Sequence, residues 1–344
     1  MVSNTRTNQS AHLLSVDLHG DILLDVLHRR RMLAEDHVLL GHHLEPLKLG
    51  QVKVQVLPVY VESRYQPEGT LRQAILAIDA LYQELSESGD AFQLVRSSQD
   101  LAATLQSDSI GVLLSFEGAE PLGRDVSLID LFYKLGLRVL GLTWNRANLF
   151  AQGVLEDTDQ GLSLLGRDLV SRANRIGVIL DVSHLNRRSF WDLLESTNGP
   201  VLASHSNAFT VCNHPRNLTD DQIRALAAKG GLIGLNFVPR FVGPGNLLSG
   251  LVNHAEHIAG LVGISHLALG PDFIDHIQHI GVFEPKTQRL LRPEEPHWPQ
   301  ELPSVRVLPL LYHELCLRGF SDDDSRSIMG TNALNFLSSH LPKE

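Results

Sequence analysis

The sequence predicts a (β/α)8 barrel, a closed ring of eight parallel strands that alternate with helices, followed by an extra C-terminal helix. Short apolar runs rich in Val, Ile and Leu recur along the chain, as in strands that are buried on both faces of a parallel sheet. Helical patterns separate most of these runs, so strands and helices alternate. The length of 344 residues suits one such barrel. We expect a single domain over 12–344 after a flexible N-terminal tail at 1–11.

Eight apolar runs mark the expected strands: Leu13–Leu18, Val52–Val61, Ile110–Phe116, Leu137–Thr143, Ile176–Val182, Pro200–Ser204, Gly231–Phe237 and His266–Leu269. The clearest helical patterns cover Thr70–Ser88, Ser163–Asn174, Arg187–Thr197, Thr219–Lys229, Leu247–Leu261 and Val305–Leu317, and Asp322–Leu337 is the expected closing helix. Thr219 with Gln222 three residues later predicts a capping box at the start of one helix. An open doubly wound sheet is the alternative, but no glycine-rich GxGxxG turn follows the first run.

The composition argues against several functional classes. With 39 acidic and 29 basic residues the formal charge is −10, and no basic stripe is present, which argues against a nucleic-acid partner. No apolar stretch approaches the roughly 18–20 residues of a transmembrane helix, and the polar N-terminus lacks the apolar core of a signal peptide. We therefore expect a cytoplasmic protein without a membrane partner. Cys212 and Cys316 lie too far apart for a CxxC site, so a metal site must use His and carboxylates.

Ionisable residues follow five of the eight apolar runs. In barrels of this class, catalytic groups lie where the strands end and the next loops begin. These ends read Asp17-Leu18-His19-Gly20-Asp21, Ser115-Phe116-Glu117, Asp181-Val182-Ser183-His184, Ser204-His205-Ser206 and Gly270-Pro271-Asp272. Burial of such groups without partners is costly, and a shared metal centre removes that penalty because imidazoles and carboxylates then face a cation.

The spacing of these residues predicts two metal ions. His19 and Asp21 are two residues apart on extended backbone, so both side chains point the same way and reach one ion. His184 and His205 follow neighbouring strands and could share a second ion, and Glu117 is placed to bridge the two. This ligand set suits Zn²⁺, with Mn²⁺ or Co²⁺ as alternatives. Two such ions about 3.5–4 Å apart can hold a bridging hydroxide, a nucleophile at neutral pH.

Asp272 follows the eighth run and is available as the general base and acid. Other histidine pairs lack a strand-end position, and we expect them to be structural: His42 with His43, His254 with His257, and His276 with His279. The last of these pairs lies in the long excursion at 274–303 after the eighth run. Its length is typical of lids and binding loops, so a role in substrate access is open.

Nine segments of the chain resemble the membrane (renal) dipeptidase family of zinc peptidases, within the amidohydrolase-like barrels. They are DLHGD at 17–21, SFEG at 115–118, LTWN at 142–145, ILDVSH at 179–184, PVLASHS at 200–206, RNLTDD at 216–221, GLNF at 234–237, GPDF at 270–273 and GTN at 330–332. The resemblance implies a zinc-dependent dipeptidase that takes dipeptides, including L,D-dipeptides. It is also compatible with a homodimer, which is common in the family.

The resemblance implies a role for each matched residue. In the family pattern, one zinc ion is bound by His19 and Asp21, the other by His184 and His205, and Glu117 bridges both. Asp272 would then carry the proton from the bridging water to the leaving amine.

Three segments bear on substrate binding. Arg216 would hold a substrate carboxylate or the developing oxyanion, a task suited to a planar guanidinium. Mammalian members carry His where this chain has Trp144, next to Asn145, and a hydroxyl-bearing aromatic where it has Phe237. The substrate-polarising groups are thus altered. A hydrolase of another amide, a lactam or a lactone is therefore the alternative, and a non-catalytic metal-binding protein is a third reading.

Overall fold

The computed structural model describes residues 13–280, 282–284, 289–291 and 302–344. The predicted tail at 1–11 and much of the excursion at 274–303 lie outside these residues. Within the described part of that excursion, β10 (Val282–Glu284) pairs antiparallel with β11 (Arg289–Leu291). The predicted role of this excursion in substrate access stays a prediction.

Eight parallel strands close into a barrel, which confirms the predicted fold. Their order around the ring is β1 (Ser15–Asp17), β2 (Val52–Tyr60), β4 (Ile110–Glu117), β5 (Leu137–Gly141), β6 (Ile179–Asp181), β7 (Val201–Ala203), β8 (Leu232–Leu235) and β9 (Leu267–Leu269). The ring closes because β1 pairs with both β2 and β9 and because β2 pairs with β4 over seven residue pairs. Each predicted apolar run coincides with one of these strands, and β4 continues one residue beyond its run.

A ninth strand was not predicted. It is β3 (Phe92–Leu94), and it pairs in parallel only with the first three residues of β4. The short helix α4 (Ser98–Leu105) follows it. The connection from β2 to β4 therefore holds an additional strand and helix, which widens the spacing between the second and third predicted runs.

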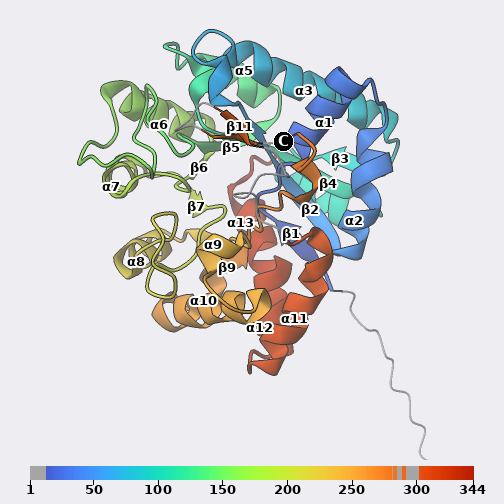
Figure 1. The fold of residues 1–344 in the computed structure, drawn as a ribbon, viewed down its shortest axis with the longest axis vertical. Coiled ribbons are helices and arrows are strands. Elements are labelled where there is room, and N and C mark those ends of the chain that lie inside the picture. The colour runs from blue at the N-terminus through green and yellow to red at the C-terminus, as the bar shows by residue number, and fades with distance from the viewer. Residues whose placement is uncertain (1–12, 281, 285–288, 292–301) are drawn as a thin grey trace, which may run out of the picture.

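Helices surround the strands (Figure 1). They are α1 (Ile22–His28), α2 (Leu44–Leu49), α3 (Thr70–Glu87), α4, α5 (Leu128–Lys134), α6 (Leu164–Ile176), α7 (Arg187–Ser196), α8 (Asp220–Ala228), α9 (Pro239–Val242), α10 (Leu247–Val262), α11 (Leu308–Leu317), α12 (Asp322–Arg326) and α13 (Asn332–His340). The predicted capping box is present at the start of α8. The predicted closing helix is α12 and α13 joined by a π-helical turn at Ser327–Thr331.

The interior of the barrel is filled by one apolar cluster that α13 completes. Inward-facing residues of the strands, such as Val16, Val54 and Leu113, pack in the same cluster as Phe336 and Leu337 of α13. A second and larger cluster lies between the strands and the surrounding helices. Catalytic groups in barrels of this class lie at the carboxyl ends of the strands. The predicted site should therefore lie at those ends.

Candidate metal centre

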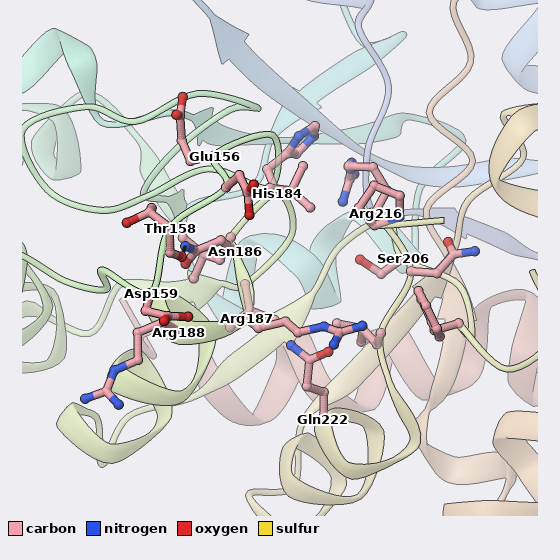
Figure 2. Close-up of a pocket in the computed structure, with 18 of the residues that line it drawn as sticks. Glu156, Thr158, Asp159, His184, Asn186, Arg187, Arg188, Ser206, Arg216 and Gln222 are labelled. Atoms are coloured by element: carbon pink, nitrogen blue, oxygen red, sulfur yellow. Dashed lines mark hydrogen bonds between the residues drawn. The ribbon is translucent and has the colours of Figure 1, made fainter. Parts of the chain in front are cut away.

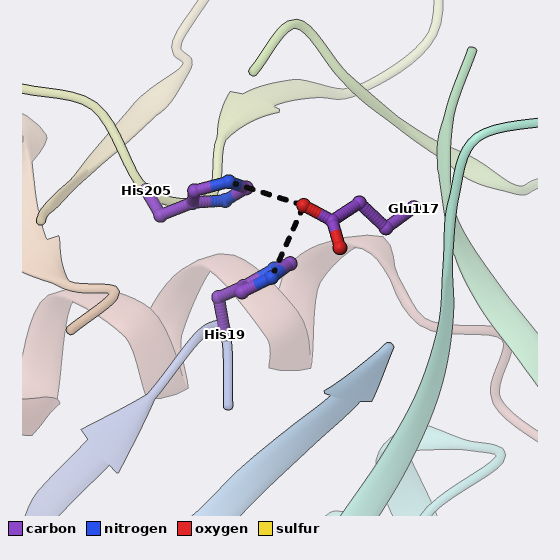
Figure 3. Close-up of side chains that lie close together, drawn as sticks. All are labelled: His19, Glu117 and His205. Carbon is purple, nitrogen blue, oxygen red and sulfur yellow. Dashed lines mark ion pairs between the residues drawn. The ribbon is translucent and has the colours of Figure 1, made fainter. Parts of the chain in front are cut away.

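Four side chains from four strand ends converge at the mouth of the barrel. Nε2 of His184 lies 2.9 Å from Oε1 of Glu117, and Nε2 of both His19 and His205 lies 3.6 Å from that same oxygen. Figure 3 shows His19 and His205 pointing at Glu117 from one side. Glu117, the most exposed of the four, is 9% accessible. One carboxylate oxygen thus meets three imidazole nitrogens, away from solvent.

The two remaining carboxylates, those of Asp21 and Asp272, also lie close to His19. Ligand atoms of His19, Asp21 and Asp272 come within 4.8 Å of one another. Asp21 is the residue before α1, and Asp272 follows β9, where its backbone N–H donates to the carbonyl of His19 at 3.0 Å. Nδ2 of Asn236 donates to Oδ2 of Asp272 at 3.0 Å and orients that carboxylate. The structure thus brings together all five predicted metal ligands and Asp272.

Hydrogen bonds decide which ring nitrogen of two histidines faces this centre. Nδ1 of His184 lies 2.9 Å from the acceptor Oδ1 of Asn145, so Nδ1 carries the proton. Ser204 Oγ donates to Asp181 Oδ2 at 2.5 Å and therefore accepts from Nδ1 of His205 at 2.6 Å. The two Nε2 lone pairs then face each other at 2.8 Å. A cation bound by both lone pairs would remove the repulsion between them. The acceptors of the two Nδ1–H groups thus act as second-shell partners, which orient the Nε2 lone pairs toward a metal.

Other polar atoms of the centre are also left without partners. Nε2 of His19 and Oδ1 of Asp21 are buried and have no hydrogen-bond partner among the described residues. Because a buried polar atom without a partner is unfavourable, these atoms need a ligand. Imidazole nitrogens and carboxylate oxygens are the donors that zinc and similar divalent cations accept. The residues present therefore fit a metal centre.

The pKa values of the buried groups at the centre shift in opposite directions. Burial opposes a positive charge on His19, but the carboxylates of Glu117 and Asp272 raise its pKa to about 10. Burial and the charge of Glu117 raise the pKa of Asp21 to about 8. Burial and the neighbouring Arg216 lower the pKa of His184 to about 3, so this ring keeps its lone pair. Such divergent shifts among buried neighbours are typical of functional sites.

Two residues of the centre have a left-handed backbone. φ is 69° at His184 and 60° at Asp272. Residues other than Gly rarely adopt this region, and such conformations cluster at active sites, where the surrounding structure holds them. At Asp272 the hydrogen bonds of its backbone N–H and its carboxylate hold the conformation.

Arg216 brings a buried positive charge to the wall of the centre. It is 5% exposed, its Nη2 donates to the carbonyl of His205 at 3.2 Å, and its Nε has no partner among the described residues. Burial lowers its pKa to about 10. Together with His184 and Ser206 it lines a cavity of about 480 Å³ (Figure 2). We call this cavity the Arg216 cavity, and the buried guanidinium of Arg216 fits an anionic group.

Comparisons with known proteins agree with this geometry. Residues 6–291 match the membrane dipeptidase family, peptidase family M19. The chain belongs to that family. It is therefore a metallo-dipeptidase, a hydrolase, and the family implies a metal cofactor.

Relatives of this membrane dipeptidase family member match most of the chain. An uncharacterized dipeptidase of Schizosaccharomyces pombe is 31% identical over 287 residues, which cover 76% of this chain and 69% of the relative. The dipeptidase tcpJ of Claviceps purpurea is 28% identical over 316 residues, covering 87% and 69%. A metallo peptidase from Rhodobacter sphaeroides, solved with a phosphinate mimic of L-Ala-D-Ala, superposes with a TM-score of 0.81 at 24% identity, covering 96% of this chain and 99% of that chain. This last likeness establishes the fold.

The predicted substrate-binding residues of this dipeptidase lie at different places relative to the metal centre. Trp144 is half-buried, with its ring centroid 5.1 Å from that of Tyr60 and 6.2 Å from that of His184. Asn145 binds His184 through its side chain, so its contact in this structure is with a proposed ligand. Phe237 is fully buried and packs edge-on against Phe273. Trp144 therefore adjoins the centre directly, whereas Phe237 belongs to the packing beneath the loops.

The histidines outside the strand ends have other partners. His43 and His279 contact opposite oxygens of Asp25 at 2.8 and 3.1 Å, and Arg29 also binds this carboxylate. His254 accepts from the backbone N–H of Ala208 and donates to a backbone carbonyl. These contacts agree with the structural roles predicted for them. In the described part of the chain, none of the helices is both long and apolar enough to cross a bilayer.

No supporting role was predicted from the sequence for four residues that hold the centre in place: Asn236, Ser204, Asp181 and Asp17. Each is a polar residue at or beside a buried strand end, which is the signal that could have found them. Asp17, for example, accepts the backbone N–H of His19 at 2.8 Å and orients the loop that carries this ligand.

Proposed function

We propose that this metallo-dipeptidase hydrolyses dipeptides at a centre of two zinc ions. In this proposal His19 and Asp21 bind one ion, His184 and His205 bind the other, and Glu117 bridges them. The observation that supports it is the pair of Nε2 atoms of His184 and His205, which face each other at 2.8 Å with both Nδ1 atoms already engaged. The partnerless Nε2 of His19 and Oδ1 of Asp21 support the first ion.

The chemistry divides between the metal and the chain. Bound divalent cations supply Lewis acidity, which lowers the pKa of water and polarises a carbonyl. Asp272 accepts a proton from the attacking water and delivers it to the departing nitrogen as the C–N bond breaks. Because Asn236 holds Oδ2 of Asp272, Oδ1 is left to carry this proton.

Arg216 would bind the substrate's C-terminal carboxylate. A guanidinium presents two parallel N–H donors that match a carboxylate, and the Nε of Arg216 is free to donate. The carboxylate would also neutralise a charge that is buried in the free protein. L,D-dipeptides are included in the proposal because the similar Rhodobacter sphaeroides protein was solved with a mimic of L-Ala-D-Ala.

Metal analysis combined with a panel of L,L- and L,D-dipeptides tests the proposal. We expect close to two metal ions per chain and release of free amino acids from part of the panel. Metal-loaded protein that cleaves no dipeptide but opens a lactone or a lactam would contradict it. That outcome would favour the alternative in which Trp144 reshapes the pocket for another substrate.

The proton transfer has its own test in Asp272→Asn. An asparagine amide can neither accept the proton of the attacking water nor deliver it to the departing nitrogen. We therefore expect kcat to fall by about 10²–10⁴-fold while the metal content stays unchanged. Asp275→Asn, three residues along the chain and paired with His276, is the control and should keep its activity. Full activity in Asp272→Asn would exclude the proposed proton carrier.

A further inference from the structure

The centre opens on a second cavity that lies away from Arg216. This cavity has a volume of about 310 Å³, and Tyr60, Glu117, Glu120 and Trp144 are among the residues that line it. We call it the Glu120 cavity. Glu117 lines this cavity and His184 lines the Arg216 cavity, and these two side chains are 2.9 Å apart. A molecule that reaches from one cavity into the other therefore passes the reacting position.

The two cavities differ in charge. Three arginines and three carboxylates line the Arg216 cavity, and of these six side chains only that of Arg216 is buried. The Glu120 cavity is lined by Glu120, by Arg146 and by the proposed metal ligand Glu117. The cation that also lines the Glu120 cavity, Arg146, is directed to Glu156 at 3.5 Å. Among the described residues, the side-chain partner of Glu120 is the amide of Asn148, which carries no charge, and no cation pairs with its carboxylate.

Glu120 is held in place as a binding group. Nδ2 of Asn148 donates to Oε1 of Glu120 at 3.1 Å, and Oδ1 of Asn148 is itself fixed by the backbone N–H groups of Phe150 and Ala151. The other oxygen folds over the end of β4. A Cβ at Gly118, where φ is 104°, would lie 2.2 Å from Oε2 of Glu120. The glycine thus leaves room for a carboxylate beside the centre, with Oε2 free of Asn148.

The two charged ends of a dipeptide match the buried Arg216 on one side of the centre and Glu120 on the other. The carboxylate and the ammonium of the dipeptide lie on opposite sides of the scissile bond. They are separated by roughly two residue lengths, each of about 3.5 Å. With the carboxylate on Arg216 and the carbonyl at the centre, the ammonium is directed into the Glu120 cavity. Tyr60 and Trp144, with ring centroids 5.1 Å apart, form an aromatic wall there, and such rings accept a cation over their faces.

Building on the proposed dipeptidase function, we propose that Glu120 binds the N-terminal ammonium of the substrate. Glu120 is thereby a specificity-determining residue: it selects peptides with a free amino terminus over N-blocked or des-amino compounds. Burial raises the pKa of Glu120 to about 7, and an ammonium that enters the cavity favours the ionised form.

The test compares one dipeptide with its des-amino analogue, in which hydrogen replaces the ammonium. The analogue is measured as a substrate or, where turnover is too slow, as a competitive inhibitor. In Glu120→Gln we expect kcat/KM for the dipeptide to fall by about 10- to 100-fold, mainly through KM, as for the loss of a hydrogen bond between charged groups. The analogue should change by less than about twofold, since it never made that contact. Glu62→Gln, whose carboxylate is paired with Arg64, is the matched control and should change neither.

Each outcome has a distinct meaning. An unchanged KM for the dipeptide in metal-loaded Glu120→Gln would overturn the assignment of Glu120. An equal loss for dipeptide and analogue would also overturn it, because it would indicate a structural role. If the unmodified protein cleaves no dipeptide at all, the proposed function itself fails, and this is seen before any variant is made.

Discussion

Ser204 is predicted to prepare His205 for metal binding, and Ser204→Ala tests this. The hydroxyl lies between Asp181 Oδ2 at 2.5 Å and His205 Nδ1 at 2.6 Å, and all three residues are at most 5% exposed. Without it, the Nδ1–H of His205 loses its acceptor, and the ring is free to exchange tautomers. The Nε2 lone pair is then no longer directed at the centre.

The size of the effect follows from the two hydrogen bonds lost. Leaving a buried donor or acceptor unpaired costs about 1–3 kcal/mol, so the free energy of unfolding should fall by about that amount for Asp181 and again for His205. Asp181 keeps the backbone N–H groups of Ser183 and Ser204, which places its share at the low end. Loss of a second-shell partner typically weakens metal binding by about 10- to 100-fold.

Competition with a chromogenic chelator measures the metal affinity, and urea unfolding measures stability on the same sample. Ser325→Ala is the control, because Ser325 is also fully buried but lies on α12 and contacts Cys316. It should lose some stability and no metal affinity. A folded Ser204→Ala protein that binds metal as tightly as the unmodified protein would refute the reasoning about the tautomer.

Three further predictions concern charge, protonation and packing. Arg216→Met should lower kcat/KM by about 10- to 100-fold yet raise the stability of the free protein by up to about 3 kcal/mol, because a buried unpaired charge is removed; a loss of stability in urea unfolding would contradict this. Burial lowers the pKa of His254 to about 4 from its ordinary 6.5, so stability is full above pH 6.5 and falls by up to about 3 kcal/mol as the pH drops to 4. Urea unfolding against pH should show a weaker dependence in His254→Gln, and equal slopes would exclude this group. Gly270→Ala would place a Cβ 1.6 Å from the carbonyl oxygen of Ser204, so stability should fall by about 1–3 kcal/mol and metal affinity should fall with it. The control is Gly260→Ala, whose Cβ would meet nothing within 4 Å. It should lower neither the stability nor the metal affinity in the same assays.

The barrel was predictable because its strands are buried on both faces. Runs such as Ile110–Phe116 are apolar at nearly every position, and the whole of β4 is buried in the structure. β3 pairs with one neighbour and buries only the first of its three residues, so it leaves no continuous apolar run. The short α1 and α5 were missed for a related reason, since seven residues span barely two helical turns.

The ligand set was predictable for a topological reason. The carboxyl ends of parallel strands meet at one end of a barrel, so His19, Glu117 and His205 must approach each other however distant they are in sequence. The partners of those ligands follow from no such rule. That Asn145 binds His184 depends on the path of one loop and on two side-chain rotamers. Such contacts are set by tertiary packing, which a single sequence does not reveal.

The mouth and the floor of the barrel have opposite energetic character. At the mouth, left-handed backbone at His184 and Asp272 costs about 1–3 kcal/mol for each residue, and Arg216 adds a buried charge. At the floor, Phe336 and Leu337 of α13 complete an apolar cluster with the strand interiors. A chain that devotes one end of its barrel to packing can hold unpaired polar groups at the other, where a cation and a charged substrate supply the missing partners. The unpaired polar atoms of the mouth therefore favour binding, because a bound cation or substrate supplies the partners that they lack.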